Sequence, residues 1–114
     1  MLMFYTSGKL VDHELTINVC QFFTTKYKPI KDYDVEIYFS DLSEDGVKGW
    51  QEKDNDEFLI HIHNKIETKE ELIKTILHEL VHCSQDISKP NLTNDERETE
   101  AYNLEDVYYE EFVL

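Results

Sequence analysis

One stretch of the chain, TKEELIKTILHELVH (residues 68–82), predicts a helix that packs on a core and carries a polar motif. Its start has the pattern of a capping box, in which Thr68 and Glu71 satisfy each other's backbone N–H groups. Apolar side chains then recur at helical spacing and form one stripe: Leu72, Ile73, Ile76, Leu77, Leu80 and Val81. We therefore expect a helix that begins after Thr68 and is covered along this stripe by other elements.

The same stretch ends in His78-Glu79-Leu80-Val81-His82, a run of the form H-E-x-x-H. Residues four apart on a helix lie one above the other, so His78 and His82 can present two imidazole nitrogens to one ion. Zinc binds such nitrogens, and in catalytic sites it keeps one position for water. Glu79 is then placed to take a proton from that water as a general base. The alternative is a solvent-facing side that happens to carry two histidines, since both lie off the apolar stripe.

The last part of the chain predicts a helix that can supply a third ligand. A second capping pattern begins at Thr93, and the helix runs to about Phe112. On a helical wheel Glu100 borders the apolar face, which makes it the best-placed carboxylate, with Glu96 second. The other glutamates of this acidic helix are expected to be solvated: Glu98, Glu105, Glu110 and Glu111.

The remaining chain predicts one further helix and a small sheet. Apolar spacing indicates a helix from about Leu10 to Lys28. Strand patterns follow at Val35–Phe39, more weakly at Val47–Glu52, and at Phe58–Asn64, and the last two suggest an antiparallel hairpin. We expect a single α+β domain over residues 1–114, with helices packed on a mostly antiparallel sheet.

Composition narrows the classes of partner. The 25 Asp and Glu residues outnumber the 11 Lys and Arg, so the net charge is −14. A nucleic-acid backbone and an anionic membrane would both be repelled, whereas metal ions and basic peptides would be attracted. Met1–Tyr5 has no signal-peptide pattern and no stretch is apolar enough for a membrane span, so we expect a cytoplasmic protein. Cys20 and Cys83 are expected to be free thiols. Oligomeric state is left open.

The motif and the later Glu100-Ala101 together resemble the gluzincin group of zinc metallopeptidases. The segment Glu96–Tyr102 is also similar to that of small intracellular and phage-type HExxH proteins, which implies a host cytoplasm if the chain is phage-encoded. The resemblance implies a zincin-like fold, an active-site helix and a C-terminal ligand-bearing helix. It implies zinc (Zn²⁺) held by His78, His82 and Glu100, Glu79 as general base, and a peptide or protein substrate. The group has an edge strand antiparallel to a bound peptide, and we place the substrate along Phe58–Asn64.

One departure from the family pattern leaves an alternative open. Thermolysin-like enzymes have an Asp four residues after the ligand Glu, where this chain has Leu104. Asp86 and Asp106 are candidates to orient a ligand histidine in its place. A zinc-bound interaction module without catalysis is therefore the second interpretation, and a plain acidic binding protein with an accidental motif is the third.

Several other residues carry weaker expectations. His61 and His63 point to one face of the predicted hairpin strand, where they are expected to be half-exposed or to line a cleft. His13 is expected to be solvated, and Cys83 to be a small buried thiol. Three tyrosines near the ligand helix are candidates to stabilise an oxyanion, although packing is the commoner role: Tyr102, Tyr108 and Tyr109.

Overall fold

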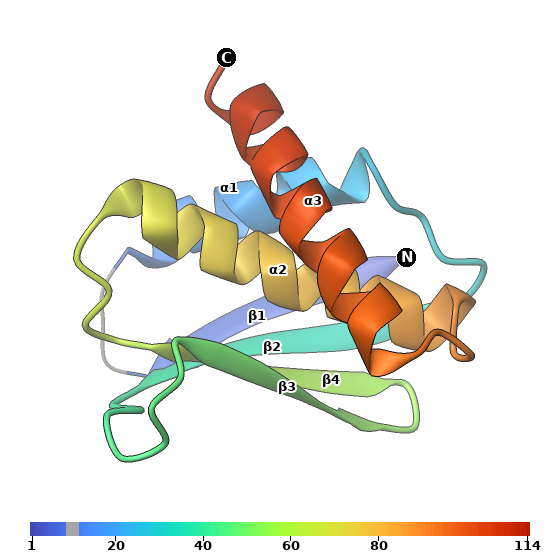
Figure 1. The fold of residues 1–114 in the computed structure, drawn as a ribbon, viewed down its shortest axis with the longest axis horizontal. Coiled ribbons are helices and arrows are strands. Elements are labelled where there is room, and N and C mark those ends of the chain that lie inside the picture. Colours follow the sequence, from blue (N-terminus) through green and yellow to red (C-terminus); the bar gives the residue numbers. More distant parts are fainter. Residues whose placement is uncertain (9–11) are drawn as a thin grey trace.

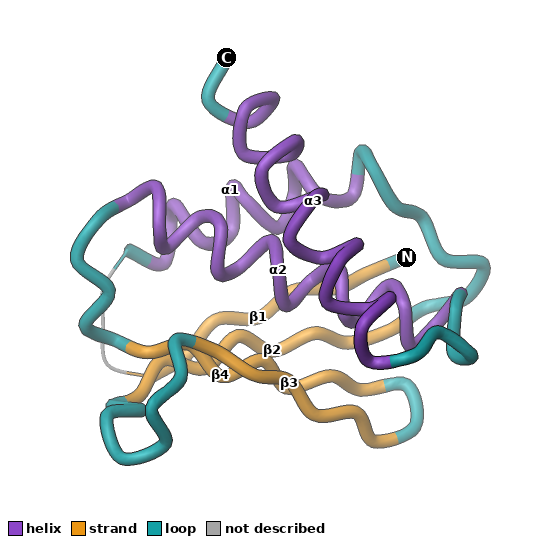
Figure 2. Tube along the Cα trace, viewed as in Figure 1, coloured by secondary structure: helices purple, strands orange, loops and turns teal. Residues whose placement is uncertain are grey.

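A mixed sheet with helices on one face forms the framework of the protein (Figure 1). The computed structural model describes residues 1–8 and 12–114. In chain order the described elements are β1 (Leu2–Gly8), α1 (His13–Thr24), β2 (Tyr33–Ser40), β3 (Gly49–Asp54), β4 (Glu57–His63), α2 (Lys69–Ser88) and α3 (Asn94–Phe112). The predicted α+β class is confirmed, with strands and helices in separate layers (Figure 2).

The sheet is not mostly antiparallel, and that expectation was wrong. Its strand order is β1-β2-β4-β3, in which β1 pairs parallel to β2 and β2 parallel to β4. Only the predicted hairpin of β3 and β4 is antiparallel, with Trp50 opposite His61. Parallel neighbours need a crossover connection, and α1 supplies it between β1 and β2. That pairing is non-local, so no short stretch of sequence revealed it.

The edge of the sheet beside α2 is β3. β4 lies between β2 and β3, so the strand predicted over residues 58–64 has both of its backbone edges occupied. The expected placement of a peptide along that strand was therefore wrong, because only an edge strand offers free N–H and C=O groups. β3 and α2 lie side by side, with Gln51 of β3 donating a hydrogen bond to Asp86 of α2.

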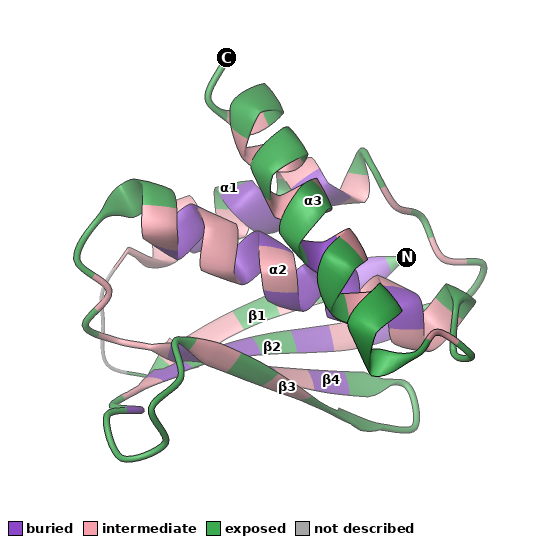
Figure 3. Ribbon diagram, in the orientation of Figure 1, coloured by how far each residue is buried: buried purple, intermediate pink, exposed green. Residues whose placement is uncertain are grey.

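The core lies between the sheet and the helices (Figure 3). β2 and β4 alternate buried and accessible positions, so one face of each strand points at the helices. Fully buried side chains of α2 meet this face, as the apolar stripe predicted. The core is built mainly from aliphatic and aromatic residues, among them Val35, Ile37, Phe39, Ile60, Ile62, Ile76, Leu77 and Leu80.

The helix ends follow the capping signals. The Thr68 side chain accepts from the backbone N–H of Glu71, although the return contact of a full box is replaced by an ion pair between Glu71 and Lys48. The box at Thr93 is complete, because Glu96 also accepts from the Thr93 backbone N–H. Each such cap stabilises its helix by about 1 kcal/mol.

Two differences at the beginning of the chain are local. The first helix spans His13–Thr24 with Asp12 as its N-cap, which is shorter than predicted; Leu10 lies outside the described residues. β1 was not expected at all, although Leu2 is buried on its inner face. Among the helices that the structure describes, none is long and apolar enough to cross a membrane.

Candidate metal centre

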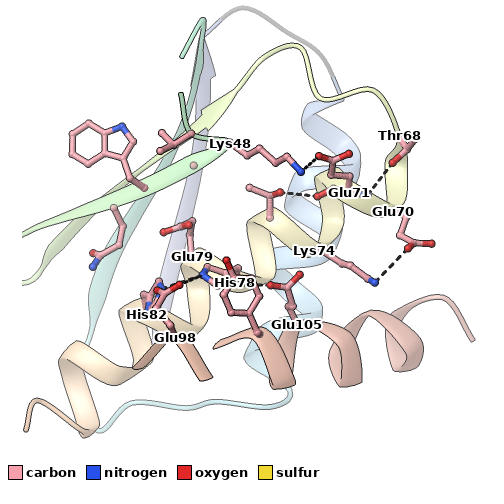
Figure 4. A pocket seen from close by; sticks show the side chains of 16 residues that line it. Lys48, Thr68, Glu70, Glu71, Lys74, His78, Glu79, His82, Glu98 and Glu105 are labelled. Atoms are coloured by element: carbon pink, nitrogen blue, oxygen red, sulfur yellow. Dashed lines mark hydrogen bonds and ion pairs between the residues drawn. The ribbon is translucent and has the colours of Figure 1, made fainter. Parts of the chain in front are cut away.

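The H-E-x-x-H run lies in the middle of α2, where the helix passes under α3 (Figure 4). Helical spacing brings the two imidazoles together, with His78 Nε2 and His82 Nε2 3.2 Å apart. The rings are nearly perpendicular, and their centroids are 4.7 Å apart. His82 is 8% exposed, so little water reaches this pair.

The other nitrogen of each histidine is held by a hydrogen-bond acceptor. His82 Nδ1 donates to Gln85 Oε1 over 2.8 Å. The Gln85 amide cannot be reversed, because its Nε2 already donates to the carbonyl of Arg97 and to Glu100. His78 Nδ1 donates to Glu105 Oε1 over 2.7 Å. With both Nδ1 atoms protonated, both Nε2 atoms are left with free lone pairs, which is the tautomer a metal requires.

The third ligand atom comes from Glu98 of α3. Its Oε1 lies 2.6 Å from His82 Nε2, and its Oε2 lies 3.5 Å from His78 Nε2. Among the described residues, these three form a group whose ligand atoms all lie within 4.8 Å of one another. Three electron-pair donors that face one another repel unless a proton or a cation lies between them.

The spacing of this group fits zinc. Two ligand atoms at about 2.0–2.1 Å from a tetrahedral zinc lie roughly 3.3 Å apart. The two separations of 3.2 and 3.5 Å agree with that value. The 2.6 Å contact of His82 is with the other carboxylate oxygen, Oε1, and is shorter, so the Glu98 carboxylate would move outward by roughly 0.7 Å to ligate zinc. The Glu98 side chain is 50% exposed and has room for that movement.

The structure does not bring Glu100 or Glu96 to the histidines. Glu100 accepts from Lys89 over 2.6 Å and from Gln85 over 3.1 Å, so its carboxylate is held by residues that follow His82 along the chain. The hydrogen bond from Lys89 lowers the pKa of Glu100. The Glu96 carboxylate accepts from the backbone N–H of Thr93 in the cap of α3. Glu100 contacts Gln85 but neither histidine.

The residues expected to orient the histidines lie elsewhere. Asp86 accepts from Arg97 of α3 and from Gln51 of β3, and thereby links both elements to α2. Asp106 pairs with Lys74. Leu104 packs against the core. The orienting contacts come instead from Gln85 and Glu105, neither of which was singled out for this role.

A cleft of about 840 Å³ lies over the histidines (Figure 4). One wall is formed by β3 and the residues before it, and the other by α2 and α3. Its lining residues are Val47, Lys48, Gly49, Trp50, Gln51, Thr68, Glu70, Glu71, Lys74, Thr75, His78, Glu79, His82, Glu98, Tyr102 and Glu105. The lining includes glutamates from α2 and α3, and both of its lysines are held in ion pairs with carboxylates. The cleft therefore favours cationic ligands.

Glu79 lines this cleft although it is only 6% exposed. Burial raises the pKa of Glu79, and the adjacent His78 and His82 offset only part of that effect. For His78, burial lowers the pKa, but the hydrogen bond to Glu105 and the nearby carboxylates outweigh it and the net pKa is raised. A carboxylate with a raised pKa is a better proton acceptor than an ordinary one.

One expected tyrosine lies at the site. Tyr102 is exposed, lines the cleft, and places its ring 4.7 Å from the ring of His78. Tyr108 packs instead against Phe22 and Phe23. Tyr109 lies under the ammonium group of Lys74.

The remaining histidines and cysteines have other surroundings. His61 is stacked on Trp50 on the outer face of the sheet, and His63 Nδ1 accepts from the backbone N–H of Leu42. His13 is half-buried and bonded to Thr6, so the expectation that it is solvated was wrong. Cys20 and Cys83 are free thiols, as predicted, and both are buried, which was expected of Cys83 only; burial raises the pKa of both.

Glu98 was not predicted as a ligand because the helical wheel ranks the carboxylates of α3 by their distance from its apolar face. Glu98, Tyr102 and Glu105 are spaced i, i+4 and i+7, so they share one face of α3. Since the histidines lie off the apolar stripe of α2, their partners also lie off the apolar stripe of α3. That spacing was the available signal.

Comparisons of the chain with protein-family models, with curated proteins and with solved structures found no match.

Proposed function

We propose that this protein is a zinc-dependent peptidase with a zincin-like fold, in which His78, His82 and Glu98 hold the metal and Glu79 is the general base. The observation that carries the proposal is the convergence of three ligand atoms from α2 and α3. Both histidines are fixed through Nδ1 by protein acceptors, so their Nε2 atoms are directed at a common point. Such fixed tautomers are typical of metal-ligating histidines.

The sheet supports a peptide as the substrate. β3 is the antiparallel edge strand and forms one wall of the cleft. In the gluzincin group, which this chain resembles, such a strand lies antiparallel to a bound peptide. A substrate strand that pairs with the free edge of β3 would pass directly over the histidines. The position of this edge strand beside the motif supports the proposal of a peptide substrate.

Each residue of the site has a chemical role in peptide hydrolysis. Zinc, when bound, supplies Lewis-acid polarisation of the scissile carbonyl and lowers the pKa of water. Glu79 accepts the proton of the attacking water and returns it to the leaving amine. Tyr102, whose ring lies against His78, donates a hydrogen bond from its hydroxyl to the oxygen that develops negative charge. Glu105 and Gln85 hold the histidines in place.

Peptide cleavage by zinc-loaded protein tests this proposal. A broad peptide library is incubated with the wild-type protein and with Glu79→Gln, and the products are identified by mass spectrometry. We expect cleavage by the wild type only, with equal zinc content in both proteins. Equal cleavage by both proteins would remove Glu79 from the mechanism. Zinc-loaded protein that cleaves nothing in the library would leave a zinc-bound interaction module.

A further inference from the structure

The outer face of the sheet is not covered by any described element. α1, α2 and α3 all lie against the opposite face (Figure 1). Four of the large apolar side chains that are exposed in the described residues lie on this outer face: Met3, Tyr5, Tyr38 and Trp50. Exposed apolar side chains gathered on one face mark an interaction surface more often than isolated ones do.

Three aromatic rings form a row across this face. Tyr38, His61 and Trp50 lie opposite one another on β2, β4 and β3. The rings of Trp50 and His61 are stacked at 4.0 Å with an angle of 6°, and Tyr38 meets His61 edge-on at 6.1 Å. Glu52 holds the His61 ring through Nε2 at 2.8 Å. The indole is therefore fixed in orientation although it is 40% exposed.

The next two rows of the face are acidic. Glu36 and Glu52 lie on either side of Leu59, one row from the aromatic side chains. Asp34, Glu57 and Asp54 lie opposite one another in the row after that. None of the outward positions of the four described strands carries Lys or Arg. The face thus combines exposed aromatic rings with carboxylates and no lysine or arginine, although Glu52 is bonded to His61 and Glu36 accepts from Ser7.

We propose that this face, defined by Tyr38, Trp50, His61, Glu36, Glu52 and Asp54, is a docking surface for an arginine- or lysine-rich segment of a partner protein. Guanidinium groups stack on aromatic rings and pair with carboxylates, which are the two features present here. Alternate side chains of an extended segment are about 6.6 Å apart, which matches the spacing of successive rows along a strand. A second copy of this chain is disfavoured because two such faces would repel each other.

This surface borders the cleft of the metal centre at Trp50, which belongs to both, but its carboxylates lie outside the cleft lining. Gln51, between two of its residues on β3, points to the other side of the sheet and bonds to Asp86. The proposal therefore does not depend on zinc binding or on peptidase activity. A partner held on this face would lie across β3 from the cleft.

Trp50 is the only tryptophan of the chain, so its fluorescence reports on binding at this face and, because Trp50 also lines the cleft, the variants below separate the two places. The probe is a hexapeptide of alternating arginine and serine, titrated at low salt, with glutamate in place of arginine as the control peptide. We expect a saturable change in fluorescence with the arginine peptide and none with the glutamate peptide. Glu36→Lys with Glu52→Lys should raise the dissociation constant at least tenfold. Glu36→Gln with Glu52→Gln, which is closer in shape to the wild type, should also raise the dissociation constant. This pair replaces the lysine pair in the test if the lysine pair does not fold.

Two further variants separate this surface from general attraction and from the cleft. Glu44→Lys with Glu110→Lys makes the same change in net charge at exposed positions elsewhere and should alter the dissociation constant less than threefold. Glu98→Lys places a cation in the cleft and should also leave binding unchanged. If both lysine pairs weaken binding of the arginine peptide equally, the binding depends on net charge alone. If Glu98→Lys abolishes binding, the peptide binds in the cleft. Either result overturns the proposal. A dimer that Glu36→Lys with Glu52→Lys dissociates would also overturn it.

Discussion

Replacing Gln85 by Met tests whether the support of His82 is as important as the geometry indicates. Gln85 is fully buried and makes contacts to His82, Arg97 and Glu100. Methionine has a similar length but neither accepts from His82 Nδ1 nor donates to the Arg97 carbonyl. Each of these two buried groups then loses its partner at a cost of about 1–3 kcal/mol. Burial of the apolar side chain returns roughly 1 kcal/mol, so the free energy of unfolding should fall by about 1–5 kcal/mol.

The assay is thermal unfolding of the metal-free protein, followed by zinc titration. For 114 residues the entropy of unfolding is roughly 0.24 kcal/mol/K, so the melting temperature should fall by about 4–20 °C. Zinc affinity should fall about 10- to 100-fold, because the His82 ring is no longer held.

Glu100→Gln is the matched control, because it keeps Gln85 in place and removes a contact near the surface. Its ion pair with Lys89 is partly exposed, so less than about 1 kcal/mol should be lost and zinc affinity should not change. A Gln85→Met protein that melts within about 2 °C of the wild type and binds zinc equally well would refute the reasoning.

Three further predictions concern single groups. Burial raises the pKa of Glu79 above its ordinary value of 4.5, so the ionised carboxylate destabilises the folded protein at pH values above 4.5. Glu79→Gln should therefore stabilise the metal-free protein increasingly as the pH rises from 4.5. Urea unfolding at about pH 4 and about pH 8 measures this difference. The hydrogen bonds from Ser43 and Lys65 lower the pKa of Asp41 to about 2. The contribution of these contacts to stability is therefore complete above the ordinary pKa of 3.8 and is lost as the pH falls toward 2. In an NMR titration, Ser43→Ala should raise the pKa of Asp41. Thr93→Ala should lower the free energy of unfolding by about 1 kcal/mol in chemical denaturation, and no change would exclude the cap as a stabilising contact.

The elements that local patterns specify were predictable from the sequence. The apolar stripe and the capping threonine located α2, and the pattern at Thr93 located α3 to its last turn. The hairpin of β3 and β4 followed from two short strands and a polar turn. In each of these cases the residues that determine the element lie within a few positions of one another.

The features that depend on distant parts of the chain were not predictable in the same way. The pairing of β1 with β2 joins residues separated by about thirty positions, as in Leu2 with Tyr33, and it is one of the two parallel pairings of the sheet. The choice between Glu98 and Glu100 depends on how α3 is rotated above α2. The wheel of α3 ranked Glu100 first because it borders the apolar face, whereas the histidines lie to the side of that face. Such a rotation is set by packing between helices.

Zinc content in four purified proteins tests the central claim most directly. Wild type, His82→Ala, Glu98→Ala and Glu100→Ala are prepared without chelator or affinity tag, loaded with zinc, dialysed and measured by elemental analysis. The proposed site predicts about one zinc per chain in the wild type and in Glu100→Ala, and loss in the other two. Zinc that is lost in Glu100→Ala but kept in Glu98→Ala would contradict the ligand set, and a wild type that holds no zinc would contradict the site itself.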